Sequence, residues 1–351
     1  MIVKTGIVRD ERYLRHETGR FHPESPQRLE AIYEMLDSSD MKGKFVNIKP
    51  RYADEDEISA VHSQSYIERV ASTSGKKQTF LDPDTETSPE SFGIAKLAVG
   101  GLLNAIDGVI EGGVNNAFAL IRPPGHHAER GHAAGFCIFN NVAVGALHAI
   151  RNHRMKKILV VDWDLHHGNG TQNTFYEDPK VLYFSTHQFP FYPGSGSVNE
   201  IGRGSGLGYT INVPLRRGPG DAEYLRIFRK ILEPVALDYK PDLVLLSAGF
   251  DIYYNDPLGG MQVTPAGFRN LVRVLLNIAD ACSKGRFVVT LEGGYNIQGL
   301  RDSVKAVLLE MKGESYQTDE TLNDVESQAD SGIDTIIQTV IKQIEPIWRV
   351  F

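Results

Sequence analysis

The chain has 351 residues, of which 41% are hydrophobic and 23% are charged, a composition typical of a folded globular protein and not of a disordered or fibrous one. Lys and Arg number 37 against 44 for Asp and Glu, and this net charge of −7 gives no electrostatic basis for binding nucleic acid. Residues 1–12 carry charges where a signal peptide needs an apolar run, and no stretch approaches the roughly 18 consecutive apolar residues of a membrane span. We therefore expect a cytoplasmic protein with neither a nucleic acid nor a membrane as partner.

Short apolar runs alternate with amphipathic stretches along the chain. In chain order they predict a helix at 91–111, a strand at 117–121, a helix at 140–152, strands at 157–162, 181–185 and 209–214, a helix at 221–238, a strand at 242–247, a helix at 265–284, a strand at 286–291 and a helix at 297–311. Strands that are apolar along their whole length are covered on both faces, and a β-α-β order indicates parallel pairing. The predicted fold class is therefore α/β, a single domain with one mostly parallel sheet, and functional residues are expected beyond the carboxyl ends of its strands.

The composition changes near the C-terminus. Residues 313–331 are polar and acidic, and an apolar helical pattern follows at 333–347. We interpret 1–313 as the main domain and 314–351 as an acidic linker and a C-terminal helix that packs back on it. A helix that binds a partner is the alternative.

A candidate metal site follows the strand at 157–162. The chain there reads Asp162-Trp163-Asp164-Leu165-His166, and an extended backbone would turn Asp162, Asp164 and His166 to one side. Two carboxylates and one imidazole form a set of three protein ligands with an open fourth position, as in catalytic metal sites. Such a set suits Zn²⁺ and also Fe²⁺.

Two adjacent histidines, His126 and His127, follow the strand at 117–121 after a rigid Pro-Pro-Gly turn. Held beside a metal, such a pair can act as general acid and base. The second ring nitrogen of each imidazole needs a partner, and Asp162 and Asn169 are available. The alternative is that the pair has a turn or metal-binding role without proton transfer.

Two further residues complete this set of candidates. Asp251 follows the strand at 242–247, where another metal ligand would lie, and Tyr295 follows Gly293-Gly294, where its phenol would donate a hydrogen bond to an oxyanion. His148 and His153, inside and at the end of a predicted helix, are interpreted as surface or packing residues.

These runs, in this order, resemble the histone deacetylase and acetylpolyamine amidohydrolase family. The resemblance rests on Arg122-Pro123-Pro124-Gly125-His126-His127, on the run from Asp162 to Thr171, on Ser247-Ala248-Gly249-Phe250-Asp251 and on Glu292-Gly293-Gly294-Tyr295. It extends from about Arg20 to about Gly313, so that 1–313 would be the deacetylase catalytic domain. It implies an arginase-like fold with an eight-stranded sheet covered by helices on both faces, and hydrolysis of an N-acyl amide at a single zinc.

The resemblance also implies a role for individual residues. The metal ligands would be Asp164, His166 and Asp251, while Asp162 would orient His126. His127 would be the general base and Tyr295 would polarise the acyl carbonyl. Asn169, the partner of His127, stands where the main nuclear deacetylases have Asp, which resembles the class II branch. The compact chain favours a prokaryotic deacetylase.

Two structural potassium ions are implied as well. The first would lie near the zinc and the second farther away. The implied ligands are Asp162, Asp164, His166, Ser185 and Thr186 for the first ion and Phe175, Asp178, Val181 and Tyr209 for the second.

The implied substrate tunnel would grip an apolar four-carbon linker between Phe136 and Tyr192. Leu258 stands where the polyamine-specific eukaryotic member has a glutamate, and this favours acyl-lysine in a protein or peptide over an acetylated polyamine. Asp82 or Asp84 would accept hydrogen bonds from a peptide backbone, and the alternative is that both are solvated turn residues. The full predicted group is Phe136, Tyr192, Leu258, Gly135, Gly294 and Asp84.

The alternatives are an acetylpolyamine amidohydrolase, a different metal hydrolase and a non-catalytic acyl-lysine binding module. A homo-oligomer is a further possibility that the sequence leaves open.

Overall fold

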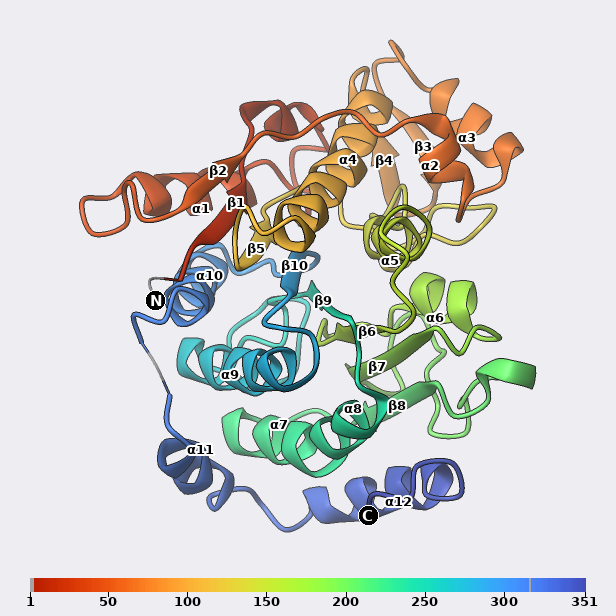
Figure 1. The fold of residues 1–351 in the computed structure, drawn as a ribbon. Coiled ribbons are helices and arrows are strands. Elements are labelled where there is room, and N and C mark those ends of the chain that lie inside the picture. The colour runs from red at the N-terminus through yellow and green to blue at the C-terminus, as the bar shows by residue number, and fades with distance from the viewer. Residues whose placement is uncertain (1–2, 316) are drawn as a thin grey trace.

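The computed structural model describes residues 3–315 and 317–351 (Figure 1). Its centre is an eight-stranded sheet in the order β2-β1-β5-β10-β9-β6-β7-β8, with parallel pairing between all neighbours. The predicted α/β fold class, with one eight-stranded parallel sheet, is therefore confirmed. All of the chemistry-bearing runs follow strands of this sheet.

The strands are β1 (Thr5–Val8), β2 (Val46–Ile48), β5 (Asn116–Ala119), β6 (Ile158–Asp162), β7 (Val181–Gln188), β8 (Thr210–Leu215), β9 (Leu243–Ala248) and β10 (Phe287–Leu291). Every residue of β6, β9 and β10 is buried, as their continuous apolar runs predict. All six predicted strands are present. The sequence analysis missed β1, β2 and a separate antiparallel hairpin of β3 (Thr79–Asp82) and β4 (Thr85–Thr87).

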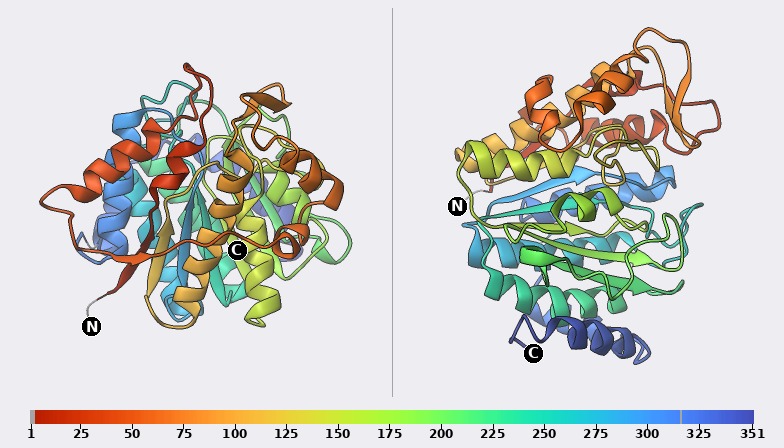
Figure 2. Two further views of the ribbon diagram at one scale, coloured as in Figure 1. Left: turned by 90° about the horizontal axis from the view of Figure 1, so that it is seen from above. Right: turned by 90° about the vertical axis from the view of Figure 1, so that its right-hand side faces the viewer.

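Helices cover both faces of the sheet (Figure 2). One layer contains α4 (Ser91–Ile110), α5 (Asn141–Asn152) and α6 (Asn169–Phe175), with the short α2 (Glu55–Ser59) and α3 (Gln64–Ala71) outside it. The other layer contains α1 (Gln27–Asp37), α9 (Pro265–Cys282), α10 (Ile297–Met311) and the continuous helical run α7 (Asp221–Ile227), η3 (Phe228–Leu232) and α8 (Glu233–Tyr239). Short 3₁₀ turns lie at η1 (Glu11–Arg15) and η2 (Gly204–Gly206).

Side-chain caps fix where three of these helices begin. The side chains of Asn140, Thr264 and Asn296 accept hydrogen bonds from the third backbone N–H of α5, α9 and α10. These caps lie beyond the carboxyl ends of the strands. They therefore fix the ends of the loops that connect β5, β9 and β10 to the helices that follow.

The C-terminal segment differs in part from the prediction. The expected linker contains a helix, α11 (Asp319–Glu326), whose capping Thr318 was not recognised, and residue 316 of that linker lies outside the described residues. The final helix is α12 (Ile333–Ile344), which contacts β8 and buries Ile337, Val340 and Ile344. The last helix thus packs against the β8 side of the sheet.

One helix of the described residues, α4, is long and apolar enough to cross a membrane. Of its most apolar stretch, 67% is buried inside the protein, and it contacts β1, β5, β10 and α5. These contacts are those of a core helix in a layered fold.

Candidate metal and catalytic site

Three potential metal ligands converge beyond the carboxyl ends of β6 and β9. Asp164 and His166 follow β6, Asp251 follows β9, and the two strands are paired neighbours. Nδ1 of His166 lies 3.1 Å from Oδ1 of Asp164 and 3.0 Å from Oδ2 of Asp251. One ligand atom from each residue lies within 4.8 Å of those of the other two.

Asp162 does not join this group. Its Oδ1 accepts the backbone N–H of Asp164 at 3.1 Å, and this turns the chain out of the extended path on which the spacing argument depended. Its Oδ2 lies 3.0 Å from Nδ1 of His126 instead. The expectation from strand alternation, that Asp162 ligates with Asp164 and His166, is therefore corrected.

The donor set fits a divalent transition metal. Asp164 and Asp251 are 1% and 0% exposed, so two carboxylates are buried against a single imidazole. Buried charge of this kind is stable only when it is compensated, and a cation held between these oxygens and the ring nitrogen compensates it. Backbone N–H groups of Leu165 and Gly293 donate to the remaining carboxylate oxygens at 2.8 and 2.9 Å.

Glycines let the backbone approach the carboxylates. A Cβ at Gly249 would lie 2.0 Å from Oδ2 of Asp164, and one at Gly293 would lie 2.6 Å from Oδ2 of both Asp164 and Asp251. No side chain fits at either position, which explains why both glycines flank the site.

The two adjacent histidines have the partners predicted for them. His126 faces Asp162, and Nδ1 of His127 lies 2.8 Å from Oδ1 of Asn169. Nδ2 of Asn169 donates to Oε1 of Glu129 at 2.9 Å, which fixes the amide with its oxygen towards His127. The proton of neutral His127 is therefore on Nδ1, and Nε2 is left as the basic nitrogen.

The pKa values of His126 and His127 are shifted differently by their surroundings. Burial, together with the charges of His126 and His166, holds the pKa of His127 well below its usual value. Burial also opposes the charged form of His126, but the carboxylates of Asp162 and Asp164 outweigh it and raise the pKa of His126 to about 10. The pKa values of the two adjacent rings are thus shifted in opposite directions.

Aromatic rings border the cluster. The ring of Tyr192 meets the rings of His127 and His166 edge-on, at centroid distances of 5.1 and 6.1 Å. On another side, Phe136 meets the ring of Tyr295 at 5.9 Å. Tyr192 is 40% exposed and Tyr295 is half-buried, so these rings lead from the surface to the ligand group.

The other predicted substrate-binding residues lie on loops around these rings. Oδ1 of Asp84 accepts the N–H of Gly135 at 3.1 Å, and a Cβ at Gly135 would lie 2.3 Å from the ring of His127. Gly294 has φ +115°, and its carbonyl accepts Nε of Arg28 at 2.7 Å. Leu258 is half-buried on the loop after β9.

Asp256 is a functional candidate that the sequence analysis missed. Its Oδ2 accepts the backbone N–H groups of Tyr295 and Asn296 at 2.7 and 2.9 Å, and its Oδ1 accepts that of Leu258 at 2.9 Å. It therefore ties the Leu258 loop to Tyr295. Asp256 stands two residues before Leu258 in the sequence, but an isolated Asp gives no indication of such remote partners.

Glu292 was also missed as a positioning residue. Its Oε2 accepts the N–H groups of Gly125 and His126 at 2.7 and 3.2 Å, and its Oε1 accepts Oγ of Ser247 at 3.0 Å. Burial raises the pKa of Glu292 to about 7. Through these bonds the side chain of Glu292, which follows β10, joins strand β9 to the loop that follows β5.

The implied potassium ligands lie at the end of β6 and just after it, at the end of α6, in the turn before β7, on β7 and directly before β8. Ser185 is the register partner of Asp162, and the buried Oγ1 of Thr186 has no hydrogen-bond partner in the described part of the chain. The carbonyls of Phe175 and Asp178 already accept backbone N–H groups at 3.0 and 3.3 Å. The remaining proposed ligands are Asp164, His166, Val181 and Tyr209, and their role in binding potassium stays a prediction.

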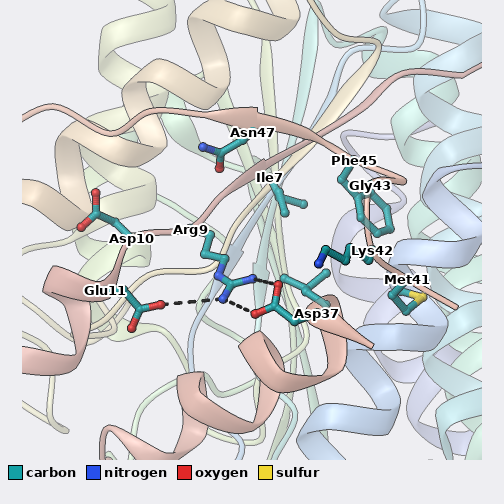
Figure 3. A pocket seen from close by; sticks show the side chains of 11 residues that line it. Ile7, Arg9, Asp10, Glu11, Asp37, Met41, Lys42, Gly43, Phe45 and Asn47 are labelled. Atoms are coloured by element: carbon teal, nitrogen blue, oxygen red, sulfur yellow. Dashed lines mark hydrogen bonds and ion pairs between the residues drawn. The ribbon is translucent and has the colours of Figure 1, made fainter. Parts of the chain in front are cut away.

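A separate hollow of about 370 Å³ lies beside β1, α1 and β2 (Figure 3). Arg9 donates to both carboxylate oxygens of Asp37 at 2.7 and 2.6 Å inside it. Its central charges are thus paired with each other, and it contains none of the predicted site residues. The candidate site is therefore the histidine and aspartate cluster.

The family model and three related sequences that match this chain are those of deacetylases. The histone deacetylase domain model matches residues 22–311. Histone deacetylase HDA1 of Candida albicans is 38% identical over 98% of this chain, and a probable deacetylase of Archaeoglobus fulgidus is 39% identical over 84% of it. Polyamine deacetylase HDAC10 of Homo sapiens is 42% identical over 80% of it.

The extent of these matches differs. The chain spans 45% of the Candida protein and 43% of the human one, about half the length of these relatives, but 82% of the archaeal one. The crystal structure of the HDA15 HD domain superposes with a TM-score of 0.91 at 37% identity, covering 99% of this chain and 96% of that one. With a family model that matches most of its length and a shared fold, this chain belongs to the histone deacetylase family.

Proposed function

We propose that this chain is a metal-dependent deacylase that removes an acetyl or other short acyl group from the side chain of acyl-lysine. The observation that carries the proposal is the group of Asp164, His166 and Asp251 beside His127, whose Nδ1 is held by Asn169 so that Nε2 is the basic nitrogen. We propose Zn²⁺ as the ion, with Fe²⁺ as the alternative that the same ligands suit.

In the proposed hydrolysis the metal ion, His127 and Tyr295 have separate roles. An ion held by the three ligands would lower the pKa of a water molecule and polarise the acyl oxygen. Nε2 of His127 takes the proton from the attacking water and returns it to the leaving amine. The phenol of Tyr295 donates to the developing oxyanion.

The proposed substrate follows from the rings and from Leu258. Phe136 and Tyr192 offer flat apolar faces to an alkyl linker. Leu258 offers no negative charge to a second ammonium group, which favours acyl-lysine over a polyamine. The relative named as a polyamine deacetylase keeps acetylpolyamine hydrolysis as the second candidate. A non-catalytic acyl-lysine binding module is disfavoured because His127, Tyr295 and all three ligands are present.

Turnover measurements test this proposal. The zinc-loaded protein is assayed with an acetyl-lysine peptide, N8-acetylspermidine and acetylputrescine, with Asp251→Ala as the matched control. We expect the highest kcat/KM on the peptide and none with the control. A preference for the polyamines would support the second candidate, and binding of the peptide without turnover would support the binding module.

A further inference from the structure

A second group of potential metal ligands lies at the amino ends of the strands, opposite the candidate catalytic site. Asp107 is near the end of α4, His148 is in the last part of α5, and His153 is the residue after that helix. Helices α4 and α5 contact each other, and their C-terminal ends lead into β5 and β6 (Figure 1). This group therefore lies at the amino ends of the strands, whereas Asp164, His166 and Asp251 follow the carboxyl ends.

The three side chains converge. Nε2 of His148 lies 2.6 Å from Oδ1 of Asp107, and Nε2 of His153 lies 2.7 Å from the same oxygen. One ligand atom from each residue lies within 4.8 Å of those of the other two. His148 and His153 come from different helical turns, and each directs its Nε2 at Oδ1 of Asp107. An ion can therefore bind between these three atoms.

The other nitrogen of His148 is a second, independent observation. Nδ1 of His148 is buried, and within the described residues it has no hydrogen-bond partner, although Oε1 of Glu57 lies 3.9 Å away. If neutral His148 carries its proton on Nε2, the lone pair of Nδ1 faces the Glu57 carboxylate. A metal on Nε2 places the proton on Nδ1, which then points at that carboxylate. This is the usual outer partner of a metal-bound histidine.

The surroundings admit an ion. The side chains of His148, His153 and Asp107 are 7%, 17% and 28% exposed, so the group opens to solvent on the side of His153 and Asp107. Arg51 is engaged with both oxygens of Glu57 at 2.7 Å. Ligand atoms around a tetrahedral zinc lie about 3.3 Å apart, so the contacts of 2.6 and 2.7 Å to Asp107 must lengthen by about 0.6–0.7 Å, which the partly exposed side chains of Asp107 and His153 allow.

We infer that Asp107, His148 and His153 form a second site for a divalent transition metal, with Zn²⁺ as the ion that two imidazoles and one carboxylate suit. Water completes the coordination on the exposed side. The ion joins the end of α4 to the end of α5, away from the reacting groups, and so stabilises the fold without entering the reaction. When zinc binds through the two Nε2 atoms, each neutral imidazole keeps its single proton on its own Nδ1, and in His148 this nitrogen faces Glu57.

Zinc counting on the full chain tests the inference. Metal-free protein is dialysed against micromolar Zn²⁺ and the bound zinc per chain is measured. The variants are His153→Gln, Asp251→Asn and their combination, with the exposed His132→Gln as the matched control. We expect His153→Gln and Asp251→Asn each to bind one zinc fewer than the wild type, the double variant two fewer, and His132→Gln the same number as the wild type.

Two further readouts keep the test independent of activity. In the Asp251→Asn variant, which lacks the first zinc site, added zinc is expected to raise Tm by binding at the second site. Adding His153→Gln to this variant is expected to abolish the zinc-dependent rise in Tm. X-ray absorption of zinc in Asp251→Asn is expected to show two imidazole ligands. If His153→Gln disturbs folding, as circular dichroism would reveal, Asp107→Asn replaces it, because the amide preserves shape and hydrogen bonding but ligates poorly. An unchanged zinc count in His153→Gln or in Asp107→Asn, or binding only at millimolar zinc, would overturn the inference.

Discussion

Asn169 orients His127 through one hydrogen bond of 2.8 Å, and Glu129 in turn orients Asn169 through a bond of 2.9 Å. We predict that Asn169→Leu lowers kcat about 10- to 100-fold, because His127 loses the partner that fixes its tautomer and ring orientation. Zinc content should stay unchanged. In the control Glu129→Gln, the amide oxygen still accepts from Asn169, so kcat should change little. Full activity in Asn169→Leu would contradict the role given to this bond.

The fold was predictable where the chain is apolar without interruption. Strands such as β6 and β9 are buried on both faces, so composition alone reveals them. β1 and β2 have four and three residues, too few for a periodic signal. Helix α11 is polar on most of its surface and was taken for a linker.

The site was predictable only in part. Asp162 and Asn169 could be named as partners of His126 and His127, although 36 and 42 residues separate them, because both stand in the polar run that follows a predicted strand. Asp251 was expected as a further ligand because it also follows a strand, but its grouping with Asp164 and His166 came from the family resemblance. Asp256 was missed because it is an isolated Asp, and nothing near it in the sequence indicates its partner Tyr295. Local alternation also placed Asp162 wrongly, since a side chain to backbone hydrogen bond overrides it.

Tyr295 is predicted to act on the transition state. Tyr295→Phe removes one donor to the oxyanion and should lower kcat/KM about 100- to 1,000-fold. The ring and its contact with Phe136 remain, so peptide binding should persist. Steady-state kinetics and peptide binding by calorimetry measure the two effects. Unchanged kcat would remove Tyr295 from the reaction.

His127 and Asp251 are predicted to separate proton transfer from metal binding. His127→Ala should abolish nearly all turnover while keeping the zinc content of the wild type at this site. Asp251→Ala should lose both, because it removes one of three ligands. Elemental analysis beside kinetics distinguishes them. Loss of zinc in His127→Ala would make His127 a ligand instead of a base.

Leu258 is predicted to influence substrate choice by charge. Leu258→Glu places a carboxylate on the loop that Asp256 ties to Tyr295. We expect kcat/KM for N8-acetylspermidine to rise relative to that for an acetyl-lysine peptide, since an anion attracts the second ammonium group. Leu258→Gln is the matched uncharged control. An equal effect of both substitutions would mean that shape and not charge governs the choice.

Glu24 is predicted to stabilise the fold in a pH-dependent way. Burial alone would raise its pKa, but Arg122, with Nη2 at 2.8 Å from Oε2, and Arg28 outweigh burial and lower the pKa of Glu24 to about 2. Because the folded-state pKa lies below the unfolded value of about 4.5, this stabilisation is complete above that pH. It is lost as the pH falls from about 4.5 towards 2.

Glu24→Gln leaves two buried guanidinium groups without their counter-charge. At pH 7 it should lower the free energy of unfolding by about 3–5 kcal/mol, and the difference from wild type should shrink below about pH 4.5. Urea unfolding of the metal-free protein between pH 7 and pH 3 measures this. Glu90→Gln is the control, because Glu90 pairs with Arg15 on the surface and should matter by less than about 1 kcal/mol. Equal stability of the two variants at pH 7 would show that the buried network does not stabilise the fold as described.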